Sequence, residues 1–118
     1  MEYQYKKAKN LLERQNEARE IIEKYPQRVP VICERDQSST LEDIQKKKYL
    51  VPYDMTGSQF SFIIRQKLRL TKESALFLLV NGKVSIVGNQ TMSEIYQMHK
   101  DVEDNFLYIT YTSQLTWG

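Results

Sequence analysis

Hydrophobic residues in the first part of the chain recur at three-, four- and seven-residue steps among charged side chains. This is the spacing of an amphipathic helix, and it predicts a helical block over residues 3–25. Asn10 can cap such a helix and leave residues 3–8 as a separate short turn. Pro26 ends the block, because the residue before a proline is pushed out of the helical conformation.

Two β-branched and aliphatic segments follow, and both predict strands. The first, RVPVICER at 28–35, contains Pro30, which indicates an early position or one whose N–H is not used in the sheet. The second, KKKYLVP at 46–52, stops at Pro52. The segment 36–45 between them is polar and turn-prone. We therefore expect the two strands to form a hairpin with a long loop.

The second half of the chain carries signals for two helices and a tight hairpin. Thr56 and Thr91 each open a capping box, which predicts a helix at each position. The run ALFLLV at 75–80 is wholly apolar, as in a central strand that is buried on both faces. Asn81 and Gly82 form a strong hairpin-turn signal, so the segment KVSIV is expected to return as a short partner strand.

The resulting order is helix, two strands, helix, two strands, short helix and a last strand at 106–112. A hairpin, a crossing helix and further strands on one sheet describe the β-grasp, the ubiquitin-like fold. We therefore predict an α+β protein with a helical extension over 1–27, a ubiquitin-like β-grasp core over 28–112 and a flexible tail over 113–118. A chain of 118 residues is long enough for a single domain.

Composition argues against several classes of function. The only cysteine, Cys33, and the only histidine, His99, cannot supply the ligands of a zinc site. Cys33 lies in the middle of a predicted strand, where a free cysteine is usually a small buried hydrophobe. No glycine-rich phosphate-binding pattern, signal peptide or membrane-spanning run occurs in the sequence. We expect no enzyme, no metal and no cofactor, and a reducing compartment such as the cytoplasm.

Basic residues are concentrated between Lys46 and Lys72, where seven of them accompany a single acid, Asp54, although the net charge of the chain is only +2. Such a patch suits an acidic peptide or a membrane surface, and it is equally common as a solvated face. Alternation along the strand 46–52 is expected to point Lys46, Lys48 and Leu50 to one face and Lys47, Tyr49 and Val51 to the other. The lysines of this strand have two interpretations as well. They protect a sheet edge from unwanted pairing, or they accompany an edge that accepts an extended peptide as an extra strand.

The polar tail after the last strand ends in Gly118. A carboxylate that forms an amide linkage has to pass through a narrow channel in an activating enzyme, and a glycine carries no side chain to obstruct it. The six residues after Thr112 reach at most about 20 Å when fully extended. Glycine is a common residue, so its position at the end of the chain is weak evidence on its own.

Several segments together resemble the autophagy ubiquitin-like modifiers of the GABARAP and microtubule-associated protein light chain 3 type. They occur in the same order along the whole chain: YPQRVPVICER, KKKYLVPYDMT, FSFIIRQKLRL, ALFLLVNGK and FLYITYTSQLTWG. The resemblance implies a two-helix N-terminal extension on a ubiquitin-like core. It also implies that Gly118 is joined to the amine of phosphatidylethanolamine by an activating and a conjugating enzyme, and released by a deconjugating cysteine protease.

Members of this family bind receptors and adaptors through aromatic-x-x-aliphatic motifs, which add a strand to the edge of the second strand. The resemblance implies an aromatic pocket formed by Glu17, Ile21, Pro30, Ile32, Lys48, Leu50 and Phe106. It implies an aliphatic pocket formed by Tyr49, Val51, Pro52, Met55, Phe60 and Ile63. The residues that would meet acidic side chains beside the motif are Arg28, Lys46 and Lys67. The implied location is the cytoplasm and, after lipidation, autophagosomal membranes, with a monomer before conjugation.

The chain departs from the family pattern at a few positions. Trp117 stands where Phe or Tyr is more frequent, and Lys67 stands where Arg is frequent, which would weaken a bidentate contact with a carboxylate. The segment KVSIVGNQTM lacks the Pro-Pro of GABARAP-type members and is nearer the light chain 3 type, whereas KKKYLVP is closer to the GABARAP type, so the subfamily stays open. Two other hypotheses remain: a ubiquitin-like protein modifier or sulfur carrier of another class, and a nucleic-acid-binding module that uses the basic residues with exposed tyrosines.

Overall fold

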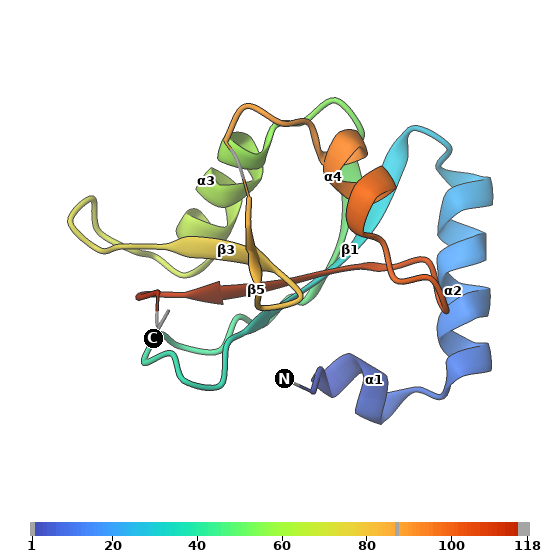
Figure 1. Cartoon of the computed structure of the whole chain (residues 1–118), viewed down its shortest axis with the longest axis horizontal. Coiled ribbons are helices and arrows are strands. Elements are labelled where there is room, and N and C mark those ends of the chain that lie inside the picture. The colour runs from blue at the N-terminus through green and yellow to red at the C-terminus, as the bar shows by residue number, and fades with distance from the viewer. Residues whose placement is uncertain (1, 87, 116–118) are drawn as a thin grey trace.

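The structure is a computed structural model that describes residues 2–86 and 88–115. Its elements are α1 (Gln4–Ala8), α2 (Leu11–Lys24), β1 (Arg28–Arg35), β2 (Lys48–Pro52), α3 (Gly57–Lys67), β3 (Phe77–Val80), β4 (Val84–Ser85), α4 (Met92–His99) and β5 (Leu107–Thr112). The strand order in the sheet is β2-β1-β5-β3-β4. β1 and β5 run parallel, and the other neighbouring strands run antiparallel. This is the predicted ubiquitin-like β-grasp, and two helices precede it in the chain (Figure 1).

The N-terminal helical block is divided at Asn10, where the sequence offered a cap. The Asn10 side chain accepts a hydrogen bond from the backbone N–H of Glu13 at 2.9 Å. The Glu13 carboxylate accepts one from the backbone N–H of Asn10 at 3.0 Å. This reciprocal capping box satisfies two amides that the first turn of α2 leaves without a helical partner. The chain therefore starts a second helix at Leu11.

Each face of the sheet carries its own hydrophobic core, because successive side chains of a strand point to opposite faces. The larger core lies under α3 and α4 and contains Val31 and Cys33 of β1 together with Ile109 of β5. The smaller one lies under α2 and contains Ile32 and Tyr108. Burial raises the pKa of the Cys33 thiol, so this cysteine is the inert hydrophobe that its position in the sequence predicts.

The apolar run 75–80 contains β3, which has a neighbouring strand on each side as predicted for a central strand, while the strand in the middle of the order is β5. All six residues of β5 are buried. β3 lies between β5 and the two-residue strand β4, and its first residue, Phe77, is only partly buried. The apolar run therefore reflects core contacts on both faces, which a strand next to the edge also makes when helices and loops cover it.

The turn prediction and the capping box at Thr56 are confirmed, and Thr91 caps its helix without the reciprocal bond to its own backbone N–H. Asn81 and Gly82 have φ angles of 53° and 71°, the left-handed conformation that a tight hairpin turn requires. The hydroxyl group of Thr56 accepts from the first turn of α3, and that of Thr91 does the same for α4. α4 continues to His99, so this histidine ends a helix and does not lie in a loop.

β2 begins at Lys48, two residues later than predicted. The ammonium group of Lys46 lies 5.0 Å from the ring centre of Tyr49, on the α3 side of the sheet. The ammonium group of Lys47 instead donates a hydrogen bond to the Gln4 side chain of α1, at 2.5 Å. The predicted orientations of Lys46 and Lys47 are therefore wrong. The alternation of a strand does not extend into the loop before it.

The structure describes the tail as far as residue 115. The predicted attachment point, Gly118, and the unusual Trp117 both lie outside the described residues. Within the described ranges, no helix has the length and apolar character needed to cross a bilayer. The same part of the chain brings no three His, Cys, Asp or Glu side chains together in a way that would hold a metal ion.

Candidate functional site

β2 is one edge of the sheet, the other being the two-residue strand β4, and the backbone of β2 offers hydrogen-bonding groups to an additional strand. Just before β2, the carbonyl of Lys47 accepts a hydrogen bond from the N–H of Cys33 in β1, at 2.7 Å. In an antiparallel pair the residues facing the partner alternate with residues facing away from it. The N–H and C=O groups of Lys48 and Leu50 therefore point away from β1, toward the open edge.

Pro52 and Arg28 limit this edge, whereas Pro30 of β1 does not affect it. Pro30 lies before the first pair between β1 and β5, Val31 opposite Leu107, so its missing N–H removes no hydrogen bond from the sheet. Pro52 ends the supply of outward N–H groups, because it has none. At the same end, the Arg28 side chain donates to the outward carbonyl of Leu50 at 2.9 Å.

The structure brings six of the seven predicted aromatic-pocket residues together on the α2 face. Ile21, Ile32 and Phe106 form a buried cluster, and the partly buried Leu50 packs against it. Glu17 and Lys48 form an ion pair beside them. The seventh residue, Pro30, is buried in β1. It lines a separate hollow of about 320 Å³ together with Arg28.

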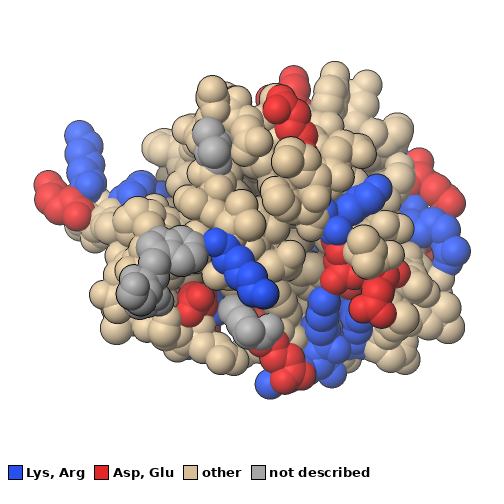
Figure 2. All heavy atoms as spheres, viewed as in Figure 1, with Lys and Arg blue, Asp and Glu red and all other residues tan. Residues whose placement is uncertain are grey.

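The rim of this cluster is a group of charges around Glu17. Its carboxylate accepts hydrogen bonds from the phenol of Tyr5 and the ammonium groups of Lys9 and Lys48. Burial alone would raise the pKa of Glu17, but the hydrogen bonds from Lys48, Lys9 and Tyr5 outweigh it and lower the pKa to about 2. In Figure 2, basic and acidic side chains likewise lie next to one another over the region of α1 and α2.

Sequence reasoning did not assign Tyr5 or Lys9 to this site. Both residues come from α1 and its C-terminal end, and they reach Glu17 only because the chain folds back after Ala8. The one available signal was an aromatic residue within a strongly polar segment, which by itself does not identify the surface that it covers.

The predicted aliphatic-pocket residues lie on the α3 face and divide into two groups. Pro52, Met55 and Ile63 line a hollow of about 620 Å³. The other three belong to the larger core beneath it: Tyr49, Val51 and Phe60. Phe62 also lines the hollow and is 59% exposed, yet sequence reasoning did not select it. The helical spacing in the sequence placed Phe60 on the buried face of the helix and did not reveal that Phe62 lies in the hollow.

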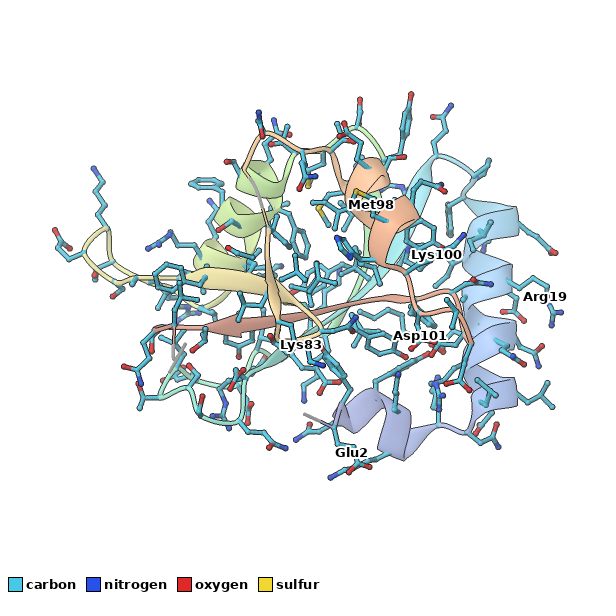
Figure 3. The ribbon with its side chains drawn as sticks, viewed as in Figure 1. Glu2, Arg19, Lys83, Met98, Lys100 and Asp101 are labelled. Atoms are coloured by element: carbon cyan, nitrogen blue, oxygen red, sulfur yellow. The ribbon has the colours of Figure 1, made fainter. Side chains whose placement is uncertain are left out.

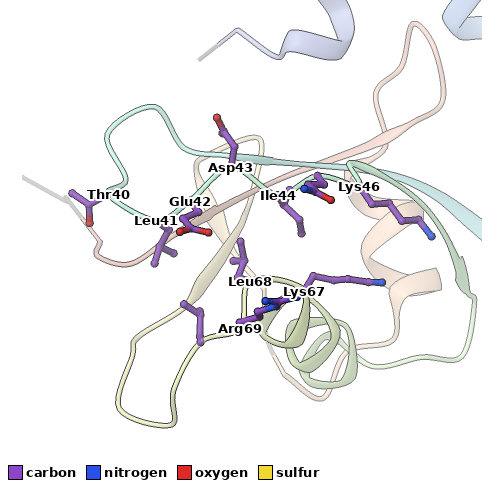
Figure 4. Close-up of a pocket in the computed structure, with 11 residues that line it drawn as sticks. Thr40, Leu41, Glu42, Asp43, Ile44, Lys46, Lys67, Leu68 and Arg69 are labelled. Carbon is purple, nitrogen blue, oxygen red and sulfur yellow. The ribbon is translucent and has the colours of Figure 1, made fainter.

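The predicted basic contacts flank both ends of β2. Lys46 and Lys67 line the same end of a hollow of about 760 Å³ between the segment 40–46 and the end of α3, and they extend in the same direction (Figure 4). Arg69 lines this hollow too, with a φ of 55°. Arg28 lies at the opposite end of the edge, because it is paired with Pro52.

Comparison with known proteins identifies the family. A family model described as autophagy protein Atg8, ubiquitin-like, matches residues 13–118. Autophagy-related protein 8 of Schizosaccharomyces pombe is 43% identical over 118 residues, which cover 100% of this chain and 96% of that protein. Autophagy-related protein 8d of Arabidopsis thaliana is 46% identical over 108 residues, 92% of this chain and 88% of that protein.

A solved structure supports the same assignment. The crystal structure of Trypanosoma brucei ATG8 matches this fold with a TM-score of 0.91 and 36% sequence identity, and the match covers 100% of both chains. The resemblance stated from the sequence segments is therefore confirmed. The residues matched by the family model begin at residue 13, so α1 is not among the matched residues.

Proposed function

This chain belongs to the Atg8 family of ubiquitin-like autophagy proteins, and we propose that it is a membrane-conjugated modifier that recruits proteins carrying aromatic-x-x-aliphatic motifs. The observation that supports recruitment most strongly is the open edge of β2. Lys48 and Leu50 offer backbone groups for an added strand, and a hydrophobic site lies on each side of the sheet beside them. In this function the protein binds and carries partners and does not catalyse a reaction.

The spacing of the motif follows from the geometry of an added strand. Successive side chains of a strand point to opposite faces of the sheet. The aromatic pocket is on the α2 face and the aliphatic hollow is on the α3 face. Two anchors that are three positions apart point to opposite faces, whereas anchors two or four positions apart point to the same face. The rise between the two anchors is about 10 Å.

The direction of the bound peptide follows from the order of the two sites along β2. The aromatic pocket includes Lys48, at the start of the strand, and the aliphatic hollow includes Pro52, at its end. A peptide with its aromatic anchor first therefore runs parallel to β2. Residues before the motif then approach Lys46 and Lys67, and residues after it approach Arg28. Acidic peptide residues at these positions would mainly raise the association rate and fix the register of the bound strand.

The membrane part of the proposal concerns the tail. β5 ends at Thr112, and six further residues lead to Gly118, a reach of at most about 20 Å from the sheet. A phosphatidylethanolamine attached there brings two acyl chains, and each buried CH₂ contributes about 0.8 kcal/mol to membrane binding. The partners would be the activating and conjugating enzymes, a deconjugating cysteine protease and receptors. The protein would be found in the cytoplasm and on autophagosomal membranes.

Substitution of the terminal glycine tests the conjugation. In Gly118→Ala we expect the phospholipid adduct to disappear, because a methyl group next to the reacting carbonyl obstructs entry into the activating enzyme. The substitution lies in the tail, so the melting temperature should not change. The measurement is intact-mass spectrometry of protein recovered from membranes of cells in which autophagy has been induced.

The masses also separate the proposal from its alternatives. The unsubstituted protein should carry one phosphatidylethanolamine. A ladder of protein adducts, or the mass of a thiocarboxylate, would assign the chain to another class of ubiquitin-like protein. A normal phospholipid adduct on Gly118→Ala would contradict the attachment point.

A further inference from the structure

The hydrophobic floor of the predicted aromatic pocket is closed in this structure. Ile32 and Phe106 are both 0% exposed, and Ile21 is 8% exposed. Ile32 borders an existing hollow, but a ligand ring can contact Ile21 and Phe106 only after another group moves away. The hollow on the α3 face differs, because Met55 and Ile63 in its lining are only partly buried.

The group that packs on this floor is Tyr5 of α1. Its ring meets Phe106 edge-on, with 5.2 Å between the ring centroids. Its hydroxyl group donates to Glu17 at the rim. The ammonium groups of Lys9 and Lys48 each lie 5.7 Å from the Tyr5 ring centroid. An apolar ring on the floor with its polar end bonded at the rim is how an aromatic residue of a ligand would be held in this pocket.

No side chain within α1 is buried, but Tyr3, the residue before it, is anchored in the smaller core with its ring centroid 4.8 Å from that of Tyr108. The residues of α1 itself are held mainly by polar contacts. The Glu34 carboxylate accepts from the backbone N–H groups of Gln4 at 2.8 Å and Tyr5 at 2.9 Å. Lys6 pairs with Asp101 at 2.7 Å, and Figure 3 places Asp101 in the loop between α4 and β5. The Lys6–Asp101 pair is partly exposed and exchanges for water at small net cost, whereas the hydrogen bonds to the buried Glu34 fix the start of α1. A short helix held in this way opens before the core does.

A hollow already exists next to Tyr5. It measures about 370 Å³ and lies between α1 and the start of β2, with Tyr5, Ala8 and Lys9 on one wall and Ile32 and Lys48 on the other. Movement of the Tyr5 ring away from Phe106 would extend this hollow to the buried floor. The pocket therefore needs a displacement of α1 and no change in the sheet.

We propose that Tyr5 is an internal ligand of the aromatic pocket and that α1 is an autoinhibitory strap which the aromatic anchor of a peptide displaces. The inference rests on the proposed function and adds the regulation of its peptide site. Because the closed state competes with the ligand, the apparent dissociation constant equals the intrinsic one divided by the open fraction. Every anchor that needs the pocket is weakened by the same factor, and a peptide without such an anchor is not weakened.

The test compares two peptides on three proteins by titration calorimetry. The peptides are an acidic-flanked Trp-x-x-Leu sequence and the same sequence with Ala in place of Trp. The proteins are the wild type, Tyr5→Ala and the control Lys7→Ala, which alters an exposed residue of the same helix. We expect Tyr5→Ala to bind the Trp peptide about five- to twentyfold more tightly than the wild type does. Lys7→Ala should bind like the wild type, and the Ala peptide should show no gain.

Two outcomes would overturn the strap. Weaker or unchanged binding of the Trp peptide by Tyr5→Ala would make Tyr5 a wall of the pocket or a bystander. An equal gain for the Ala peptide would place the effect outside the pocket. Tyr5→Phe provides a second variant, because it keeps the ring and removes the hydrogen bond to Glu17, so its gain should be smaller than that of Tyr5→Ala.

A separate probe distinguishes failure of the strap from failure of the proposed function. If none of the proteins binds either peptide, the peptide-recruiting function is wrong, and the strap is then tested with indole, the side chain of tryptophan. We expect indole to shift the NMR signals of Ile32 and Phe106 at lower concentration in Tyr5→Ala than in the wild type. If both proteins need the same indole concentration for these NMR shifts, the strap is overturned.

Discussion

The two hydrophobic sites beside β2 share one strand and are built in opposite ways. On the α3 face, Pro52, Met55 and Ile63 line an open hollow whose support is a purely hydrophobic core. On the α2 face, the floor is closed by Tyr5, and the rim consists of ion pairs around Glu17. One sheet edge can thus combine a site that is always accessible with a site that opens only when charged and aromatic contacts are exchanged.

The support of the α2 face is also polar. Asp104 is fully buried and accepts hydrogen bonds from Arg14 Nε at 2.9 Å, the Tyr108 hydroxyl at 2.5 Å and the Phe106 N–H at 2.9 Å. Arg14 in turn donates to the carbonyl of Lys9 at 2.7 Å, just after α1. A single carboxylate therefore connects α2, the start of β5 and the end of α1.

Because the α2 face has a polar support and the α3 face does not, we expect the largest effect on the free energy of unfolding at Asp104. Asp104→Ala leaves the nearly buried Arg14 guanidinium without its carboxylate and should reduce the free energy of unfolding by about 3–5 kcal/mol. The matched control is Asp54→Ala, the same chemical change at an exposed residue of the α3-face hollow, which should change it by less than about 0.5 kcal/mol. Urea denaturation measures both. Equal losses for the two variants would remove the distinction between the faces.

A smaller effect is expected from acid, and again only on the α2 face. The pKa of Glu17 is lowered to about 2 in the folded protein, so its contribution is fully present above about pH 4.5, the pKa of the unfolded chain, and is lost as the pH falls toward 2. The groups that face its carboxylate are Tyr5, Lys9 and Lys48. Glu17→Gln cannot titrate at this position.

Urea denaturation at pH 6 and at pH 3 measures this contribution. The stability difference between the wild type and Glu17→Gln should be about 1–2 kcal/mol smaller at pH 3 than at pH 6, while other carboxylates titrate equally in both proteins. A difference that stays constant between the two pH values would show that Glu17 contributes nothing through its charge.

The sequence predicted best the features that are decided within a few residues. The cap at Asn10 and the turn at Asn81 and Gly82 follow from side-chain chemistry and backbone conformation at those positions, and both were found. The apolar run 75–80 predicted a strand inside the sheet, as β3 is, but an apolar run reports burial and does not report which strands lie next to it. Lys46 and Lys47 were oriented wrongly because the start of a strand depends on its partner.

The candidate site shows the same limit. The family resemblance supplied residues that the structure brings together around β2, such as Ile32 and Phe106 on one face and Ile63 on the other. Tyr5 was not found, because its contact with Phe106 joins two segments that are far apart in the chain. No local periodicity encodes such a contact, and the closed state of the pocket became visible only with the fold.

We expect β2 to accept an added strand whose two anchors enter sites on opposite faces of the sheet. The most direct measurement is calorimetry of the wild type with three acidic-flanked peptides in which one, two or three residues separate Trp from Leu. Because side chains alternate, the two-residue spacing should bind about tenfold or more tightly than either of the others. Equal affinity for all three spacings would mean that the two anchors do not enter sites on opposite faces of the sheet.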